Sequence, residues 1–407
     1  MRLKYPRDLS LSMASFSLKI IGVWLSNSYF EQWFRNVMVV YTISMLAICL
    51  CIHLWGLYFS WDDFKVFSYI SSNSVGLIMD IFKFLVILLY KKKFLSLITY
   101  MQTNFWHLNY DEYEKSIIEN AKHICIYFVG VQSFFSQITI FSYIIRPLLS
   151  NIGKNETDRI FIFNMYIDMP IYISPYYEII YLIQALSLYQ AGICYISFDN
   201  IFFIMCKHLA SQFRILRYRI VEMPNLKVRV NLDENVNTCP SSKYYNTFRS
   251  CIQQHQSLID VCAKLEEVFA VIILGQVSIF SILICFIGYQ VILANLSLSW
   301  RISFICFLLN NICQLWMFTY SCNSIMQESA NIVSAVYATP WINLSMDKYG
   351  KMIRKDLQLV TMRSLRACCL TAYGFFPISL ETCTKIISTA MSYFTLLKQR
   401  IMDIADT

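Results

Sequence analysis

Long apolar runs separated by short polar segments dominate the chain and predict membrane-crossing helices. A helix needs about 20 apolar residues to cross the hydrocarbon core of a bilayer. Seven runs meet this length, so the pattern predicts an all-α membrane protein with seven transmembrane helices. The expected spans are Val37–Phe59, Val66–Tyr90, Ile124–Leu149, Tyr176–Cys206, Val268–Leu296, Ile302–Ile325 and Ala367–Leu397.

The composition supports residence in a membrane. Of the 407 residues, 57% are hydrophobic and only 15% are charged, whereas a soluble domain carries about 25% charged residues. The net charge of +8 comes from basic residues between the apolar runs, which favours membrane topology over nucleic-acid binding. Most of the fifteen cysteines lie inside apolar runs, where cysteine acts as a small hydrophobic residue, so no disulfide framework is expected.

Basic residues also predict how the chain is oriented. With a cytoplasmic N-terminus, 25 lysines and arginines fall in inside segments and seven in outside segments. Positive residues concentrate on the cytoplasmic side of membrane proteins. We therefore expect a cytoplasmic N-terminus and an extracellular C-terminus, the reverse of a metabotropic seven-helix receptor.

The polar segments between the runs suggest helices beyond the membrane. No proline interrupts the helical pattern from Tyr176 to about Ile220, which predicts a helix of roughly 65 Å, longer than a bilayer core of about 30 Å. Residues Met223 to Ser242 contain two prolines and predict a loop. The expected organisation is a cytoplasmic or re-entrant segment (1–36), helices 1–4 (37–206), a cytoplasmic helical extension and loop (207–267), helices 5–6 (268–325), a cytoplasmic anchor segment (326–366), and helix 7 with a short extracellular tail (367–407).

The last apolar run contains more hydroxyl side chains than a simple lipid anchor needs. Thr389, Ser392, Leu396 and Gln399 recur at spacings that place them on one helix face. Small polar residues with one leucine suit a hydrated path closed by an apolar constriction, and this predicts a pore lined by helix 7. Ordinary polar packing between helices is the alternative interpretation.

Ordered motifs along most of the chain resemble the insect odorant receptor family. They are Ser174-Pro-Tyr-Tyr-Glu178 to Gln184, Asp199, His208-Leu-Ala-Ser-Gln212 to Leu216, Tyr320, Asn323, Gly374-Phe-Phe-Pro-Ile-Ser-Leu-Glu-Thr382 and Ser392-Tyr-Phe-Thr-Leu-Leu397. The final group is similar to the seventh helix of that family. Leu396 takes the family's gate position, and Glu381 with Lys385 matches its pattern of a structural charged pair.

The resemblance implies a subunit of a ligand-gated, non-selective cation channel without a cofactor, in the plasma membrane of a sensory neuron. Such receptors assemble as tetramers of an odour-specific subunit with the co-receptor Orco. The chain is similar to the odour-specific subunit, because it lacks Orco's longer cytoplasmic loop and Val-rich final segment. A gustatory receptor for soluble tastants is the nearest alternative. A secondary transporter is more distant, since no internal repeat is found.

A pocket for volatile ligands should be mostly apolar, with one or two polar groups in the outer half of the bundle. Burial of apolar area contributes about 25 cal/mol per Å² to such binding. The second to the sixth spans offer candidates, although core packing could explain any one of them. The candidates are Tyr69, Asn73, Phe135, Ile138, Tyr181, Gln184, Phe280, Phe307 and Asn311.

Other conspicuous residues suggest structural roles. Asp80 and Lys83 lie one helical turn apart in the second run, and we expect them to form a structural pair, since membrane-depth charges need partners. Asn155 lies in a glycosylation sequon of a predicted outside loop, and Asn295 in another close to its span. Cys251, His255 and Cys262 lack a fourth metal ligand, and no phosphate-binding loop or nucleophile elbow is present. The sequence thus predicts neither an enzyme nor a metal site.

Overall fold

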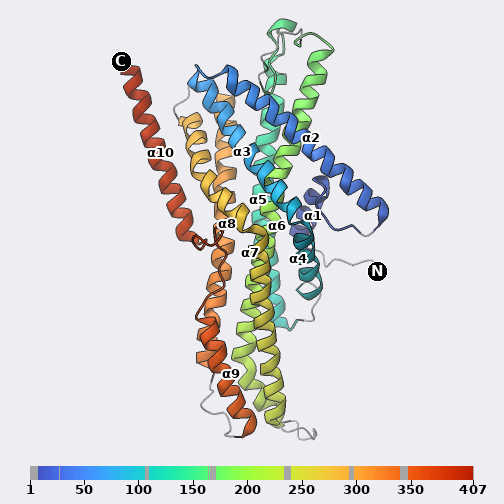
Figure 1. Cartoon of the computed structure of the whole chain (residues 1–407), viewed down its shortest axis with the longest axis vertical. Helices are drawn as coiled ribbons and strands as arrows, with labels where there is room; N and C mark the ends of the chain where they lie inside the picture. The colour runs from blue at the N-terminus through green and yellow to red at the C-terminus, as the bar shows by residue number, and fades with distance from the viewer. Residues whose placement is uncertain are drawn as a thin grey trace.

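The structure, a computed structural model, is an elongated bundle of long helices (Figure 1). It describes residues 8–26, 28–105, 110–163, 165, 171–232, 240–292, 298–339 and 347–406. The sequon residue Asn295 lies outside these ranges. Within them, regular structure is helical apart from one isolated antiparallel bridge.

Six helices in the described part of the chain are long and apolar enough to cross a membrane. This confirms the expected all-helical membrane protein and matches six of the seven predicted apolar runs. Several helices extend well beyond the run that predicted them, because the charged residues that follow these runs have good helix propensity. The six are α2 (Tyr29–Phe59), α3 (Phe64–Leu89), α5 (Glu112–Ser150), α6 (Tyr176–Leu232), α7 (Pro240–Ile292) and α8 (Leu298–Ala338).

The seventh predicted run, Ala367–Leu397, is not one continuous helix. Residues 365–379 are not helical, and α10 (Leu380–Asp406) begins only afterwards. Tyr373 and Gly374 have φ angles of 51° and 81°, in the left-handed region that a right-handed helix cannot contain. The predicted start of helix 7 was therefore wrong by about one half of the run.

A tight turn replaces the expected helical start. The amide of Ala372 donates a hydrogen bond to the carbonyl of Phe376 at 2.9 Å, and an isolated bridge joins Thr371 to Pro377. Pro377 has no amide hydrogen and cannot continue a helix ladder from the residues before it. The chain thus turns sharply before α10, which runs along the outside of the bundle and contacts α7 and α8 (Figure 1).

The central helix is α6, which packs against α1, α2, α3, α5, α7 and α8. It continues to Leu232, past the predicted end near Ile220 and through part of the predicted loop. The lower ends of α6, α7 and α8 form a narrow helical stem with α9 (Lys348–Ser364) (Figure 1). A short helix, α4 (Lys91–Asn104), follows α3 and packs against α7.

The N-terminal helix α1 (Leu9–Ile20) is fixed to α6 by a buried carboxyl group. Asp8 caps α1 by accepting a hydrogen bond from the amide of Ser10 at 3.1 Å, and it lies 3.5 Å from the ring of His208. Burial alone would raise the pKa of Asp8, but the interactions with His208 and Ser10 outweigh it and hold that pKa at about 2. Leu11, Ala14 and Leu18 of α1 are buried and belong to the main hydrophobic core.

A buried ion pair ties α3 to α6. Lys83 Nζ lies 2.7 Å from the carboxylate of Asp199, and both side chains are almost fully buried. Gln314 of α8 donates a further hydrogen bond to Asp199. Lys83 therefore forms its ion pair with Asp199 of α6. It does not form the expected pair with Asp80, which lies one turn earlier on α3.

We expect Lys83→Met to destabilise the protein by about 3 kcal/mol or more, since it leaves a buried carboxylate uncompensated. Adding Asp199→Leu should restore much of that loss, because the remaining site is apolar. Thermal unfolding of the purified receptor in detergent measures both. A double variant no more stable than the single variant would contradict this role of the pair.

Candidate functional site

A cavity of about 90 Å³ lies within the bundle. One water needs roughly 10–15 Å³, so this cavity has room for a small organic molecule. Most of its exposed wall is apolar, as expected for a ligand site. The lining residues come from α2 (Cys49, His53), α3 (Asn73, Gly76, Leu77, Asp80), α5 (Ser136, Thr139, Ile140, Tyr143), the segment after α5 (Phe163), α6 (Leu188, Ala191, Gly192, Tyr195) and α8 (Phe307, Asn310).

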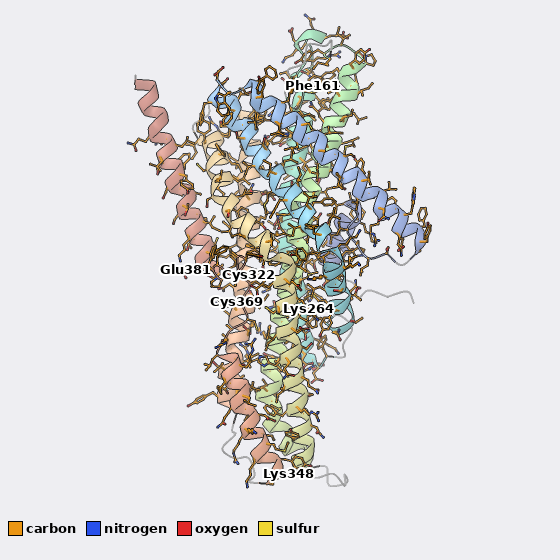
Figure 2. All side chains as sticks on the ribbon, in the orientation of Figure 1. Phe161, Lys264, Cys322, Lys348, Cys369 and Glu381 are labelled. Carbon is orange, nitrogen blue, oxygen red and sulfur yellow. The ribbon has the colours of Figure 1, made fainter. Side chains whose placement is uncertain are left out.

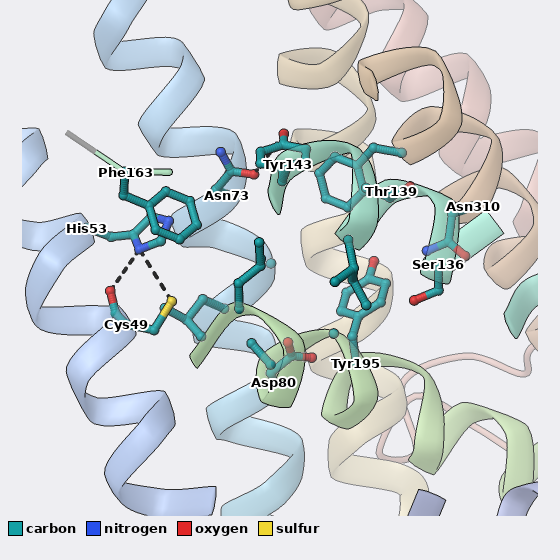
Figure 3. A pocket seen from close by; sticks show the side chains of 17 residues that line it. Cys49, His53, Asn73, Asp80, Ser136, Thr139, Tyr143, Phe163, Tyr195 and Asn310 are labelled. Atoms are coloured by element: carbon teal, nitrogen blue, oxygen red, sulfur yellow. Dashed lines mark hydrogen bonds between the residues drawn. The ribbon is translucent and has the colours of Figure 1, made fainter. Parts of the chain in front are cut away.

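Polar side chains lie at intervals around this wall (Figure 3). Tyr143 donates a hydrogen bond to Asn73 Oδ1 at 3.3 Å, and the amide of Asn73 donates to the backbone carbonyl of Tyr69 at 3.1 Å. The hydroxyl of Tyr195 donates to Asn311. These residues are held in place by the protein itself, which gives the cavity a fixed shape before any ligand enters.

Phe163 covers one side of the cavity and is held by a side chain of α6. Both polar atoms of the Gln184 amide bond to the backbone of Phe163, at 3.1 Å and 3.0 Å. The ring of Phe163 packs on the ring of His53, with the ring centroids 4.4 Å apart. A smaller cavity of about 10 Å³ adjoins here and shares both aromatic residues with the first. Tyr69 lines this second space.

The sequence candidates for the pocket fall into three groups. Asn73 and Phe307 line the main cavity, and Tyr69 lines the adjoining one. Gln184 and Asn311 contact lining residues without lining the cavity themselves. The remaining four lie elsewhere: the Tyr181 hydroxyl donates to the carbonyl of Ile144, Phe280 packs with Leu315, Cys383 and Ile386 beside α10, and Phe135 and Ile138 are half-buried on α5.

Several lining residues were absent from the candidate set. His53 and Asp80 looked like isolated polar residues in apolar runs, and Asp80 was assigned to a pair with Lys83. Phe163 lies outside the predicted spans, so no span pattern could select it. The useful signal would have been the polar residues that interrupt an apolar run, because each of them needs a partner or a cavity at membrane depth.

A second cavity, of about 200 Å³, lies between α5, α6 and α8 and has a mostly polar wall. Its lining includes Lys207, Arg214 and Glu328, and Glu328 is paired with Arg217 at 3.2 Å. A volatile apolar molecule gains little in such a polar space, because its binding depends on burying apolar area. The apolar cavity near Phe163 is therefore the better candidate for a small volatile ligand.

One face of α10 packs on the bundle and the other is exposed. Cys383, Ile386 and Ala390 are buried against the bundle, and Phe394 lies near Gly288 of α7. Thr389, Ser392, Leu396 and Gln399 all lie on the exposed side, where Leu396 is 64% exposed. An apolar side chain so exposed on a helix beside the bundle is typical of a surface that another chain or lipid covers.

The other predicted features have clear positions. Glu381 and Lys385 form an exposed ion pair at 2.7 Å near the start of α10, where Figure 2 labels Glu381. Asn155 immediately precedes a short 3-10 helix, η1 (Glu156–Asp158), at the end of the molecule where α10 also finishes (Figure 1). The C-terminal end of α10 and the sequon therefore lie at the same end of the molecule.

The fold and the cavity define a class: a multi-pass helical membrane protein with an internal apolar cavity. A family model described as 7tm Odorant receptor matches residues 63–391. Because this match covers most of the chain, the protein belongs to the 7tm odorant receptor family. The resemblance seen in the sequence motifs is thereby confirmed.

Individual relatives agree with this assignment. The chain is 25% identical over 224 residues to odorant receptor 13a of Drosophila melanogaster, covering 52% of each chain. It is 25% identical over 229 residues to odorant receptor 10 of Aedes albopictus, covering 56% of this chain and 57% of that one. The matched region thus spans about half the length of these relatives.

Among solved structures, the olfactory receptor OR5 from Machilis hrabei has the same fold. The TM-score is 0.79 with 14% sequence identity, covering 95% of this chain and 97% of that one. A second structure of OR5, in complex with eugenol, matches with the same TM-score and covers 96% of this chain. At this identity the likeness establishes the fold alone.

Gly76 offers a direct test of the cavity. A Cβ atom added at Gly76 would meet nothing within 4 Å, so a larger side chain would extend into open space. We expect Gly76→Val to weaken the binding of a cavity ligand by about tenfold or more, because it occupies the ligand's volume. The ligand is a volatile chosen by screening for thermal stabilisation of the purified protein, and the shift in Tm against its concentration measures affinity.

Gly130 of α5 provides the matched control. It also has no atom within 4 Å of an added Cβ, but it does not line the cavity. Gly130→Val makes the same chemical change in a helix, so ligand affinity should stay as in the unmodified protein. Equal losses of affinity in the two variants would show that the cavity is not where the ligand binds.

Proposed function

We propose that the chain is the odour-binding subunit of a ligand-gated, non-selective cation channel. The observation that carries this proposal is the preformed apolar cavity within the bundle of an odorant receptor fold. An apolar space of fixed shape suits small volatile molecules, which offer large apolar area and few hydrogen-bonding groups. OR5, which shares the fold, has a structure in complex with eugenol.

The exposed stripe of α10 supports a pore. Thr389, Ser392 and Gln399 place polar groups on the side of α10 that faces away from its own bundle. When identical or related subunits surround an axis, such stripes form a hydrated path, and Leu396 in each subunit forms an apolar ring that closes by dewetting. Odorant binding opens this ring if the open state binds the odorant more tightly.

A single subunit cannot enclose such a path, so the function needs assembly. We propose a heterotetramer with the co-receptor Orco in the plasma membrane of a sensory neuron. Lys398 is the residue before Gln399 on α10, where cations that enter the proposed pore would meet it. A pore made only of this chain would repeat that positive charge around its mouth, and Orco subunits would reduce this repulsion.

The distribution of charge supports a cytoplasmic stem and an extracellular C-terminus. Lys348 lies at the far end of the stem, and Phe161 lies near the opposite end of the molecule (Figure 2). The stem helix α9 contains Lys351, Arg354 and Lys355, in keeping with the concentration of positive charge on the cytoplasmic side. The sequon at Asn155 would then be extracellular.

Coexpression with Orco tests the proposed channel. Volatile application should evoke cation current, and Leu396→Ala should raise the current without odorant, because a smaller side chain widens and wets the closed constriction. We expect basal conductance to increase several-fold. This corresponds to a change on the order of one RT or more in the free-energy difference between the closed and open states.

Met391→Ala is the matched control for that variant. Met391 is also exposed on α10, at 55%, but it lies about 100° around the helix from Ser392. Its truncation should leave basal conductance as it is in the unmodified channel. Channels in which Leu396→Ala behaves like Met391→Ala, at equal surface expression, would contradict the pore assignment.

Orientation is tested separately with epitope tags on intact cells. A tag at the C-terminus should bind antibody without permeabilisation, and a tag at the N-terminus should require it. Glycosidase treatment should lower the apparent mass, and Asn155→Gln should abolish that change. A C-terminal tag accessible only after permeabilisation would refute the orientation and the proposed pore mouth together.

A further inference from the structure

Three residues of the apolar cavity each contain a buried hydrogen-bond acceptor with no partner among the described residues. These atoms are Asp80 Oδ1, His53 Nε2 and Asn310 Oδ1. Buried polar atoms in proteins nearly always have a partner, because each unpaired group costs about 1–3 kcal/mol. Three such residues around one cavity can accept hydrogen bonds from a ligand that enters it.

The histidine can be assigned as an acceptor from its other bond. His53 Nδ1 lies 2.7 Å from the backbone carbonyl of Cys49, and a carbonyl only accepts hydrogen bonds (Figure 3). Nδ1 must therefore carry the proton, which leaves a lone pair on Nε2. His53 thus offers an acceptor on the cavity wall, unless it gains a second proton.

Asp80 needs a hydrogen-bond partner more than His53 or Asn310 does, because it is the acidic residue of the three. Its side chain is 3% exposed and lines the cavity between α3 and α6. The nearest basic side chain on its own helix, Lys83, is already held at 2.7 Å by Asp199. The charges of Lys83 and Asp199 cancel each other. No ion pair joins Asp80 to a basic side chain among the described residues.

We propose that this receptor selects odorants that have a hydrogen-bond donor, an alcohol, phenol or amine group on a small apolar body, and that Asp80 recognises that donor. The inference rests on the proposed odorant-binding function of the cavity. Either oxygen of Asp80 can turn towards the ligand, because the terminal torsion of aspartate is broad. The carboxylate form of Asp80 only accepts hydrogen bonds, so an O–H or N–H group pairs with it, whereas an ether oxygen leaves it unpaired.

The rest of the wall explains why the ligand also needs an apolar body. Leu77, Ile140 and Phe307 supply apolar surface for that body. The amide of Asn73 is used by the protein, and so is the hydroxyl of Tyr195. A molecule with a donor and an apolar remainder therefore matches the wall better than an apolar hydrocarbon does.

Three probes with one carbon skeleton test the proposal: benzyl alcohol, benzylamine and benzyl methyl ether. Binding to the purified receptor is measured as the rise in Tm with probe concentration, which does not require channel opening. The alcohol and the amine should bind at least about tenfold more tightly than the ether, the effect of a hydrogen bond to an otherwise unpaired buried group.

Asp80→Leu removes the carboxyl group and should reduce that difference to less than about twofold, mainly by weakening the alcohol and amine. Asp80→Asn keeps the size of the side chain but adds a donor, so the ether should gain affinity relative to the alcohol. Thermal unfolding without ligand shows that each variant is folded before the affinities are compared. Asp62→Asn, at an exposed position after α2, is the matched control and should keep the preference.

The outcomes separate this inference from the proposed function. Equal affinities for alcohol and ether in the unmodified protein, or a preference that survives Asp80→Leu, would overturn the role of Asp80. Binding of none of the probes, while other volatiles evoke current with Orco, would overturn it as well. A donor preference in binding without current from any volatile would support Asp80 and contradict the channel.

Discussion

The requirement that polar groups at membrane depth be satisfied inside the protein shapes this receptor most strongly. Lipid offers no hydrogen bonds, so an unpaired charge there is expensive. Lys83, Asp199 and Gln314 meet the requirement together, and they do so from three different helices. The resulting link fixes α3, α6 and α8 relative to one another at the level of the cavity.

That link determines what is left for a ligand. Because Lys83 is engaged with Asp199, the nearby carboxyl of Asp80 has no countercharge on its own helix. Tyr195 lies under the ammonium of Lys83, at 5.2 Å from its ring centroid, and lines the cavity on its other side. The same few residues therefore hold the bundle together and set the chemistry of the pocket. Changes to the link should be felt in ligand preference as well as in stability.

The spans were predictable from the sequence because uncharged apolar runs of membrane length are rare outside membrane-crossing helices. Runs around Val37–Phe59 and Ile302–Ile325 both lie within observed helices. The prediction failed at the start of the last span, Ala367–Leu397, because Tyr373 and Gly374 adopt left-handed conformations that end helical geometry there. A single residue's conformation in a turn depends on its surroundings, which the pattern does not contain.

The cavity was harder to predict than the helices. Lys83 and Asp199 are 116 residues apart, so nothing local indicates that Lys83 turns towards α6 rather than to Asp80. Helix periodicity gives the face of each residue on its own helix, but the rotation of that helix against its neighbours decides which face meets the cavity. Asn73 and Phe307, two of the nine candidates, line the cavity. The position of Phe163 at the cavity could not be predicted, because it depends on two hydrogen bonds to the side chain of Gln184.

The attachment of α10 suggests how a small ligand could influence a distant helix. Near its start, α10 packs on the bundle through a small apolar cluster in which Phe280 and Leu315 contact Cys383 and Ile386. Leu315 follows Gln314 on α8, and Gln314 bonds to Asp199 beside the cavity. Of these two adjacent residues of α8, Gln314 thus contacts the ion pair and Leu315 contacts the apolar cluster beside α10. In the proposed channel, a ligand that shifts α8 by a fraction of a helical turn would change both contacts together. Because residues 365–379 are not helical, no continuous helix joins α9 to α10. In the proposed channel, α10 can therefore move relative to α9.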